Sequence, residues 1–207
     1  MKENQDFVNH IRPRWVGEGA LRIGYTFCLG GLTFLAFVVL GITGLLLMFH
    51  YQPGEQSFGS ILTIASVIPY GGTIRNLHYW AGQLMVVTIN LHMLRVVWTH
   101  AYQPPKELNW LVGVALLILI LFLDFTGYLL IGSQESGAAA TVAVNIVRLI
   151  PFIGDGLAEI LFGEPSPLNG STLVVYVWHC VALPMAAFLL QLYHFWRVRR
   201  NGGVRPL

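Results

Sequence analysis

Residues 75–95 read RNLHYWAGQLMVVTINLHMLR and place two histidines, His78 and His92, within an apolar run. A titratable side chain inside a membrane segment is energetically costly and usually functional. At 100° per residue, an interval of 14 returns the chain to within about 40° of the same helix face, ~21 Å further along the axis. The stretch therefore predicts a membrane helix that presents two histidines at two depths.

The composition of the whole chain is that of a membrane protein. Of 207 residues, 55% are hydrophobic and 11% are charged, and the mean hydropathy is +0.63, which is too apolar for a soluble domain. Four runs are long enough to cross a hydrocarbon core of ~30 Å, namely residues 26–49, 77–99, 110–131 and 172–196. We expect an all-α membrane protein with one domain over residues 1–207, in which four transmembrane helices form a bundle.

The segments between these runs are expected to be shorter structures. Residues 50–60, HYQPGEQSFGS, are rich in turn formers and predict a turn-rich exit from the first span. Residues 141–163 alternate apolar and charged positions around a Pro and a Gly, and each half is too short and too polar to span a membrane. We expect two short amphipathic helices on the outer surface between spans three and four.

The distribution of Lys and Arg predicts the orientation. With four spans, one side of the membrane receives Lys2, Arg12, Arg14, Arg22, Arg95, Lys106, Arg197, Arg199, Arg200 and Arg205, and the other side receives only Arg75 and Arg148. The positive-inside rule places both termini in the cytoplasm, with the chain in the cell inner membrane. The net charge of +2 thus reflects topology, and it predicts no nucleic-acid partner.

A second histidine pair lies in the fourth run. His179 and His194 are 15 residues apart, and spans two and four run in the same direction. His78 would therefore face His179 near the outer side, and His92 would face His194 near the inner side. Paired imidazoles are strong axial ligands of haem iron and suit electron transfer. The alternative is hydrogen-bonded helix packing, but four histidines at matched spacing favour two haems b, with iron bound by His78, His92, His179 and His194.

Two further patterns support this interpretation. Gly30 and Gly44 in the first span, and Gly113 and Gly127 in the third, repeat at the same 14-residue interval. Small residues at those depths would let flat macrocycles approach the backbone, although ordinary glycine-mediated packing also uses them.

Two arginines flank the histidines of the second span. Arg75 lies one turn before His78, and Arg95 one turn after His92. Each is a candidate partner of a haem propionate. Arg95 could equally be a positive-inside residue that reaches the membrane surface.

The motifs resemble a known family. The segments FCLGGLTF, RNLHYWAG, LHMLRVVW, PPKELNWLVG, DFTGYLL and HCVALPMAAFLLQLYH, with the ending NGGVRPL, are similar to cytochrome b6, the N-terminal cytochrome b part of quinol–cytochrome c (bc/b6f-type) oxidoreductase complexes. The resemblance implies a low-potential haem b on His78 and His179 and a high-potential haem b on His92 and His194. The 15-residue interval of the fourth span favours the b6-like branch.

The resemblance also implies a covalent haem c. In the b6 branch a cysteine in the position of Cys28 forms one thioether to an extra haem, beside the inner haem b at the quinone-reducing site. The alternative is a buried small hydrophobic residue, which is also our expectation for Cys180. The implied cofactors are two haems b, one haem c and a quinone such as menaquinone.

The outer side departs from the family pattern. The family carries Pro-Trp after the position of Leu130 and an arginine before His179, and both are missing from GYLLIGSQES and STLVVYVWH. Asp124 stands where the family has a small residue. With Tyr128 it is a candidate proton or quinone site, and pairing of Asp124 with another subunit is the alternative.

The family resemblance implies a function and its partners. We expect an electron-transfer subunit of a quinol-oxidising and quinone-reducing respiratory or photosynthetic complex. The implied partners are a C-terminal cytochrome b chain similar to subunit IV, a Rieske iron–sulfur or c-type cytochrome subunit, quinone and lipid, in a dimeric complex.

Two alternatives stay open. The first is a modified complex that exchanges electrons between quinone and periplasmic multihaem or other redox subunits without a Rieske-type cycle. The second is a membrane anchor that keeps haem only for assembly.

Overall fold

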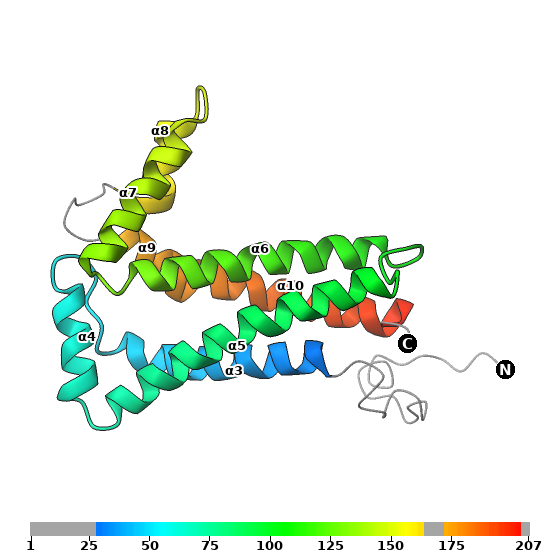
Figure 1. Ribbon diagram of the computed structural model, residues 1–207, viewed down its shortest axis with the longest axis horizontal. Coiled ribbons are helices and arrows are strands. Elements are labelled where there is room, and N and C mark those ends of the chain that lie inside the picture. Colours follow the sequence, from blue (N-terminus) through cyan, green and yellow to red (C-terminus); the bar gives the residue numbers. More distant parts are fainter. Residues whose placement is uncertain (1–27, 164–171, 204–207) are drawn as a thin grey trace.

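Four long helices lie side by side in the computed structural model, which describes residues 28–163 and 172–203 (Figure 1). They are α3 (Leu29–Met48), α5 (Gly71–Trp98), α6 (Glu107–Leu129) and a fourth helix over Leu173–Asn201, and each is long and apolar enough to cross a membrane. The predicted fold class is confirmed. The start of α3 and the end of the fourth helix lie at the same end of the bundle. The N-terminal cationic residues up to Arg22, together with Arg205, lie outside the described residues.

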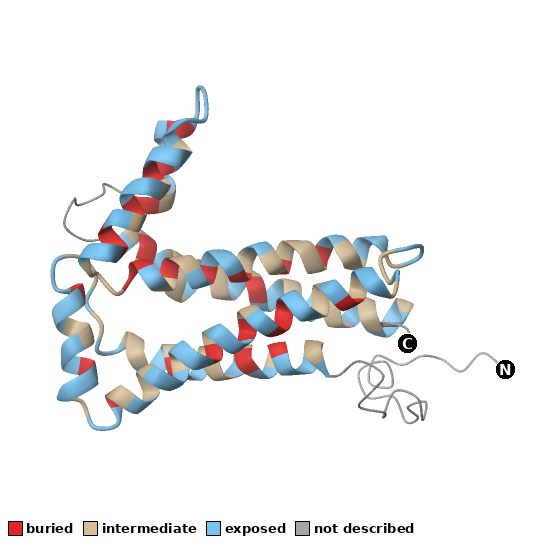
Figure 2. Cartoon of the chain, viewed as in Figure 1, coloured by how far each residue is buried: buried red, intermediate tan, exposed pale blue. Residues whose placement is uncertain are grey.

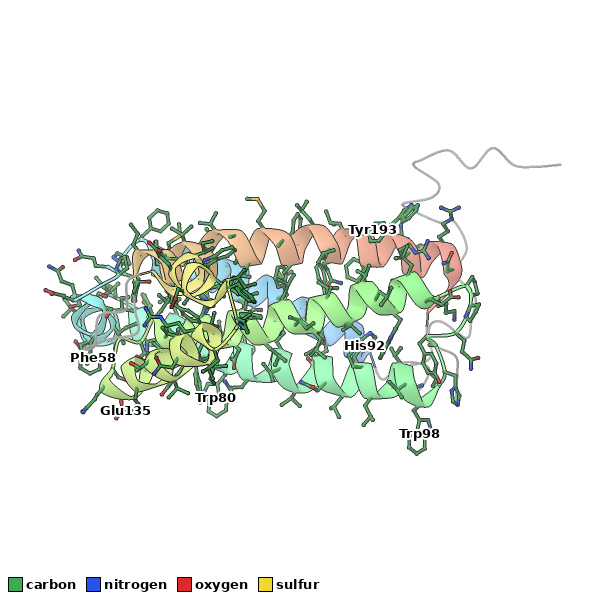
Figure 3. The ribbon with its side chains drawn as sticks, turned by 90° about the horizontal axis from the view of Figure 1, so that it is seen from above. Phe58, Trp80, His92, Trp98, Glu135 and Tyr193 are labelled. Atoms are coloured by element: carbon green, nitrogen blue, oxygen red, sulfur yellow. The ribbon has the colours of Figure 1, made fainter. Side chains whose placement is uncertain are left out.

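The second helix is longer than the span predicted from hydropathy. It begins at Gly71 rather than at residue 77, and at ~1.5 Å per residue its 28 residues extend beyond a hydrocarbon core of ~30 Å. Trp80 and Trp98 are both exposed and point away from the bundle (Figure 3). They are ~27 Å apart along the axis, which matches the interfacial positions that tryptophan prefers.

The bundle consists of two helix pairs. Helix α3 packs mainly against α5, and α6 packs mainly against α10 (Leu183–Asn201), the last part of the fourth helix. A cluster of buried apolar side chains, the mid-bundle cluster, fills the space where α3, α5 and α6 meet. Its members are Ala36, Met85, Ile89 and Ile120. Most of the remaining span surface is exposed (Figure 2), and is therefore available to lipid or to other subunits.

The fourth helix contains a π-turn. After α9 (Leu173–Val177) the chain forms η2 (Trp178–Ala182) and then continues as α10. A π-turn inserts about one extra residue into an α-helix. His179 lies in this turn, so the 15-residue interval to His194 covers nearly the same rise and rotation as the 14-residue interval in α5. This compensates for the unequal spacing of the two histidine pairs.

The short helices gather at the end of the bundle remote from the C-terminus. As predicted, two helices connect spans three and four, α7 (Gln134–Arg148) and α8 (Gly154–Phe162). Helix α7 begins at Gln134, before the predicted segment 141–163. The hydroxyl of Ser133 caps α7 by accepting a hydrogen bond from the backbone N–H of Ser136. A hydrogen bond with Ser133 also lowers the pKa of Glu135. Helix α4 (Ser57–Ser66) was not predicted. Its first residues lie in the segment 50–60, which was expected to be a turn-rich exit from the first span.

Candidate functional site: two levels of paired histidines

One histidine level, called the outer level after the predicted topology, joins the two helix pairs through His78 of α5 and His179 of the π-turn. The level of His92 and His194 is called the inner level. Their ring centroids are 6.4 Å apart and their ring planes are inclined by 68°. A bond from a metal to an imidazole nitrogen is about 2 Å long, so two imidazoles on opposite sides of one metal ion place their centroids about 6 Å apart. The separation of the two rings therefore fits one iron held between them.

The ring of His78 has a fixed partner for one nitrogen. Oγ1 of Thr43 lies 2.8 Å from Nδ1 of His78 and donates its own proton to the Val39 carbonyl at 2.7 Å. Because the hydroxyl proton is already used, the hydroxyl oxygen accepts a hydrogen bond from Nδ1–H. The carbonyl of Leu40 is a second acceptor for this ring. The lone pair of Nε2 is thus left available for a metal ion.

His179 repeats this arrangement on the other helix pair. Oγ1 of Thr126 and the carbonyl of Leu123 each lie 3.1 Å from its Nδ1. Thr126 in turn donates to the Phe122 carbonyl at 2.8 Å. Hydrogen bonds from the second ring nitrogen orient metal-bound histidines and set their tautomer. At both outer histidines the oxygen atoms beside Nδ1 favour the tautomer with Nδ1–H, which leaves the Nε2 lone pair for axial ligation.

The threonines were missed by the sequence analysis. Each directly precedes one of the outer glycines, and both lie in the pattern L-x-x-T-G, at residues 40–44 and 123–127. This local repeat between the first and third spans could have identified them, although it shows nothing of the histidine that each hydroxyl meets.

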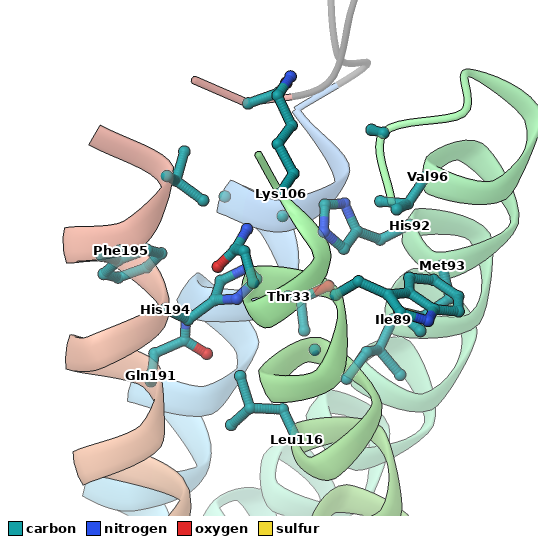
Figure 4. Close-up of a pocket in the computed structure, with 18 of the residues that line it drawn as sticks. Thr33, Ile89, His92, Met93, Val96, Lys106, Leu116, Gln191, His194 and Phe195 are labelled. Carbon is teal, nitrogen blue, oxygen red and sulfur yellow. The ribbon is translucent and has the colours of Figure 1, made fainter. Parts of the chain in front are cut away.

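The inner level borders a cavity. A space of about 260 Å³ lies among α3, α5, α6 and α10, and His92 and His194 are among the residues that line it (Figure 4). His92 is close enough to His194 to interact with it electrostatically. Nδ1 of His194 is buried and has no hydrogen-bond partner within residues 28–163 and 172–203. Met93, Gln191 and Lys106 also face this cavity.

The glycines of α3 lie against the histidines of α5. A Cβ built on Gly44 would be 3.2 Å from Cε1 of His78, and one built on Gly30 would be 3.3 Å from Cε1 of His92. By contrast, a Cβ on the neighbouring Gly31 would meet nothing within 4 Å. The absence of a side chain at these two positions thus gives space to the imidazole rings.

The glycines of α6 face the histidines of the fourth helix, closely at Gly127 and at ordinary van der Waals distance at Gly113. A Cβ on Gly127 would be 2.8 Å from Cε1 of His179, and one on Gly113 would be 3.8 Å from Cε1 of His194. The two helix pairs therefore repeat one construction, in which a glycine helix supports a histidine helix at two depths.

Arginines lie one turn from three of the histidines. Arg75 is half-buried on α5, and Arg95, one turn after the inner histidine of α5, is buried at 8% exposed. Arg197 stands in the same relation to His194, and its Nε is buried without a hydrogen-bond partner among the described residues. Arg197 was not predicted as a site residue. The repeated H-x-x-R pattern at residues 92–95 and 194–197 could have identified it.

The two cysteines have different environments. Cys28 is exposed at the N-terminus of α3, where its backbone is left-handed with φ of 50°. This exposure argues against the alternative of a buried small hydrophobic residue, and the role of Cys28 stays a prediction. It lies two residues before Gly30, which lines the inner cavity. Cys180 is partly buried and packs against an apolar cluster that includes Leu129 and Val175, as expected for a packing residue.

Asp124 and Tyr128 lie away from the histidine pairs. Both are exposed on α6, one turn apart. Thr126, two residues from each, is the residue of this segment that meets His179. A possible proton or quinone role of Asp124 and Tyr128 stays a prediction.

The donor set itself fits haem. In the part of the chain that the structure describes, no three His, Cys, Asp or Glu side chains are grouped to hold a metal ion. A macrocycle that brings its own equatorial ligands needs only two axial imidazoles from the protein, and each level offers two. The fold and the site thus define a four-helix membrane protein with two superposed bis-histidine levels.

Comparisons with known proteins agree with this class. Residues 83–207 match the family model described as cytochrome b (N-terminal)/b6/petB. The chain is 39% identical to cytochrome b6 of Heliobacterium mobile over 207 residues, which is 100% of this chain and 94% of that protein. It is 33% identical to the menaquinol:cytochrome c reductase cytochrome b subunit of Bacillus subtilis (strain 168) over 205 residues, 98% of this chain and 92% of the relative. The chain belongs to the cytochrome b (N-terminal)/b6 family.

A solved structure supports the fold. A chain of a hyperthermophilic respiratory complex III superposes with a TM-score of 0.75 at 24% sequence identity, over 88% of this chain. The match covers 49% of that chain, so our chain corresponds to about half of it.

Proposed function

We propose that this protein is the electron-transferring cytochrome b subunit of a quinol–cytochrome c oxidoreductase-type complex. One haem b binds between His78 and His179, and a second binds between His92 and His194. The observation that carries the proposal is the opposed outer pair, 6.4 Å apart, with both Nδ1 atoms hydrogen-bonded to threonine. The membrane complexes named for the relatives support the same assignment.

The residues around each level have separate tasks. Haem supplies reversible one-electron chemistry, and ligation by two histidines leaves no open position for oxygen. The histidines hold the iron, and the glycines admit the imidazoles. Arg75 on the outer side, and Arg95 and Arg197 on the inner side, neutralise propionates. The mid-bundle cluster separates two levels that lie ~21 Å apart along the helices.

The inner side also suits a third haem and a quinone. Cys28 is exposed at the cavity end of α3, where a thioether could form without unfolding the helix. A haem c on Cys28 would then lie beside the inner haem b at a quinone-reducing site. The name of the Bacillus relative favours menaquinone as the quinone.

The broader setting follows from the exposed surface and the topology. Four spans with mostly exposed faces leave room for a C-terminal cytochrome b chain, a second copy of the complex, and a Rieske or c-type cytochrome subunit. We place the protein in the cell inner membrane with both termini in the cytoplasm, because the cationic residues concentrate on that side.

The modified complex is the second candidate function. The missing Pro-Trp after Leu130 and the missing arginine before His179 favour it, because both features belong to the outer quinol-oxidising side of the family. In this version the outer haem exchanges electrons with a periplasmic multihaem or other redox subunit.

The purified complex tests the proposal. A menaquinol analogue should reduce two spectrally distinct b haems, and failure of quinol to reduce either haem would favour the membrane anchor. An iron–sulfur signal of the Rieske type would support the standard complex, whereas a complex with only c-type haem partners would support the modified one.

Intact-mass measurement of the chain tests the covalent haem separately. Wild type should carry the mass of one haem more than the bare polypeptide, and Cys28→Ala should not. A wild-type mass equal to that of the bare polypeptide would refute the haem on Cys28.

A further inference from the structure

The residues before the four site glycines differ between the two levels. Both outer glycines follow a threonine, Thr43 on α3 and Thr126 on α6. Both inner glycines follow an aliphatic residue, Leu29 on α3 and Val112 on α6. Both levels use the same two glycine helices, with the same 14-residue interval between their glycines. The residue before each glycine therefore distinguishes the outer level from the inner level.

This difference in the preceding residue changes the hydrogen-bond partners of the histidine rings. At the outer level both hydroxyls lie 2.8–3.1 Å from Nδ1 of a histidine, and both have given their own proton to a backbone carbonyl. At the inner level, Nδ1 of His194 is buried without a hydrogen-bond partner among the described residues. Val112 is itself buried and carries no hydroxyl at the position that corresponds to Thr126.

Such hydrogen bonds change the ligand electronically. An imidazole that donates its second N–H to an oxygen acceptor becomes more basic and passes more electron density to the metal. Added electron density stabilises the ferric over the ferrous state, which lowers the reduction potential. The outer level has this hydrogen bond on both axial ligands.

We propose that Thr43 and Thr126 are positioning residues that lower the reduction potential of the outer haem below that of the inner haem. The inference rests on the proposed binding of one haem b at each level. Electrons that enter at the outer side then pass to the inner haem spontaneously. The two hydroxyl groups contribute to this ordering of the potentials without any difference in the axial ligands.

Redox titration of the two b haems in isolated membranes tests this proposal. Thr43→Val and Thr126→Val should each favour ferrous over ferric outer haem by up to about tenfold, which is about 59 mV for a one-electron couple. The double variant should shift further, and the inner haem should stay unchanged. Thr43→Ser keeps the hydroxyl and should keep the wild-type potential.

The reverse substitution is Val112→Thr, which adds a hydroxyl at the inner level with almost no change in side-chain volume. It should give His194 an oxygen acceptor and lower the inner potential, while the outer potential stays constant. Because Thr43→Ser and Val112→Thr retain or add a hydroxyl, they test the idea even if a valine variant fails to assemble.

Two outcomes must be kept apart. If wild type binds two b haems but the potentials do not follow the hydroxyls, or both haems shift equally, the role of the threonines is refuted. If wild type does not bind two b haems, the proposed function itself fails.

Discussion

The imidazole of His179 lies directly against the backbone of Gly127. A Cβ at Gly127 would be 2.8 Å from Cε1 of this ring, closer than real Cβ contacts allow. Hydrogen bonds with Thr126 and the carbonyl of Leu123 hold the ring against this same helix, so the ring cannot withdraw from Gly127 without losing them. Gly127 is thus required by the position of the histidine.

Gly127→Ala should therefore lose the outer haem selectively. The methyl group should displace the ring of His179 from its hydrogen bonds, and the reduced-minus-oxidised spectrum should retain only the inner b haem. Gly41→Ala on α3 is the control, because a Cβ there meets nothing within 4 Å and alanine is the better helix former. Full haem content in Gly127→Ala would contradict this account of the glycine.

Arg197 should raise the reduction potential of the inner haem, because its positive charge lies at a half-buried position one turn from His194 and favours the ferrous state. We expect Arg197→Ala to lower that potential and Arg197→Lys to restore most of it, measured by redox titration. Arg200 is exposed over the ring of Trp196 and is the control, since solvent and salt screen its charge. An unchanged inner potential in Arg197→Ala would exclude this role.

Gly132 should be essential for stability at the junction of α6 and α4. Its φ is +67°, and a Cβ there would be 1.9 Å from Oγ of the fully buried Ser57. Gly132→Ala should lower the free energy of unfolding by about 2 kcal/mol or more, seen as a reduced Tm in detergent. Gly59→Ala on α4, where a Cβ is unobstructed, should leave Tm nearly unchanged. Equal Tm values for the two variants would refute the packing described.

Tyr51 should stabilise the same end of the bundle. Its hydroxyl donates to the Leu130 carbonyl at 2.6 Å, and its ring stacks on Tyr176. Tyr51→Phe keeps the stacked ring and removes the hydrogen bond, so it should cost about 1 kcal/mol. Thermal unfolding measures this loss of stability. The control is Tyr79→Phe, which makes the same change at an exposed position of α5. No loss relative to that control would argue against the hydrogen bond.

The four spans and the four-histidine pattern could be predicted because hydropathy and helical period are properties of one helix at a time. The threonines could not be assigned, because the meeting of Thr43 with His78 depends on how α3 packs against α5. The π-turn at His179 could not be predicted either, because it depends on how the fourth helix lies beside α5. Only the comparison with the 14-residue histidine interval of α5 shows that the π-turn accommodates one extra residue. Helix α4 was missed because the turn formers before Ser57 concealed a short apolar helix.

The content of non-covalent haem b per chain in wild type, His179→Ala and His194→Ala decides whether the two histidine levels each hold a haem. We expect two haems in wild type and one in each variant, with the outer haem absent from His179→Ala and the inner haem absent from His194→Ala. A wild-type protein with fewer than two, or variants that both keep two, would contradict the two levels of histidine ligation.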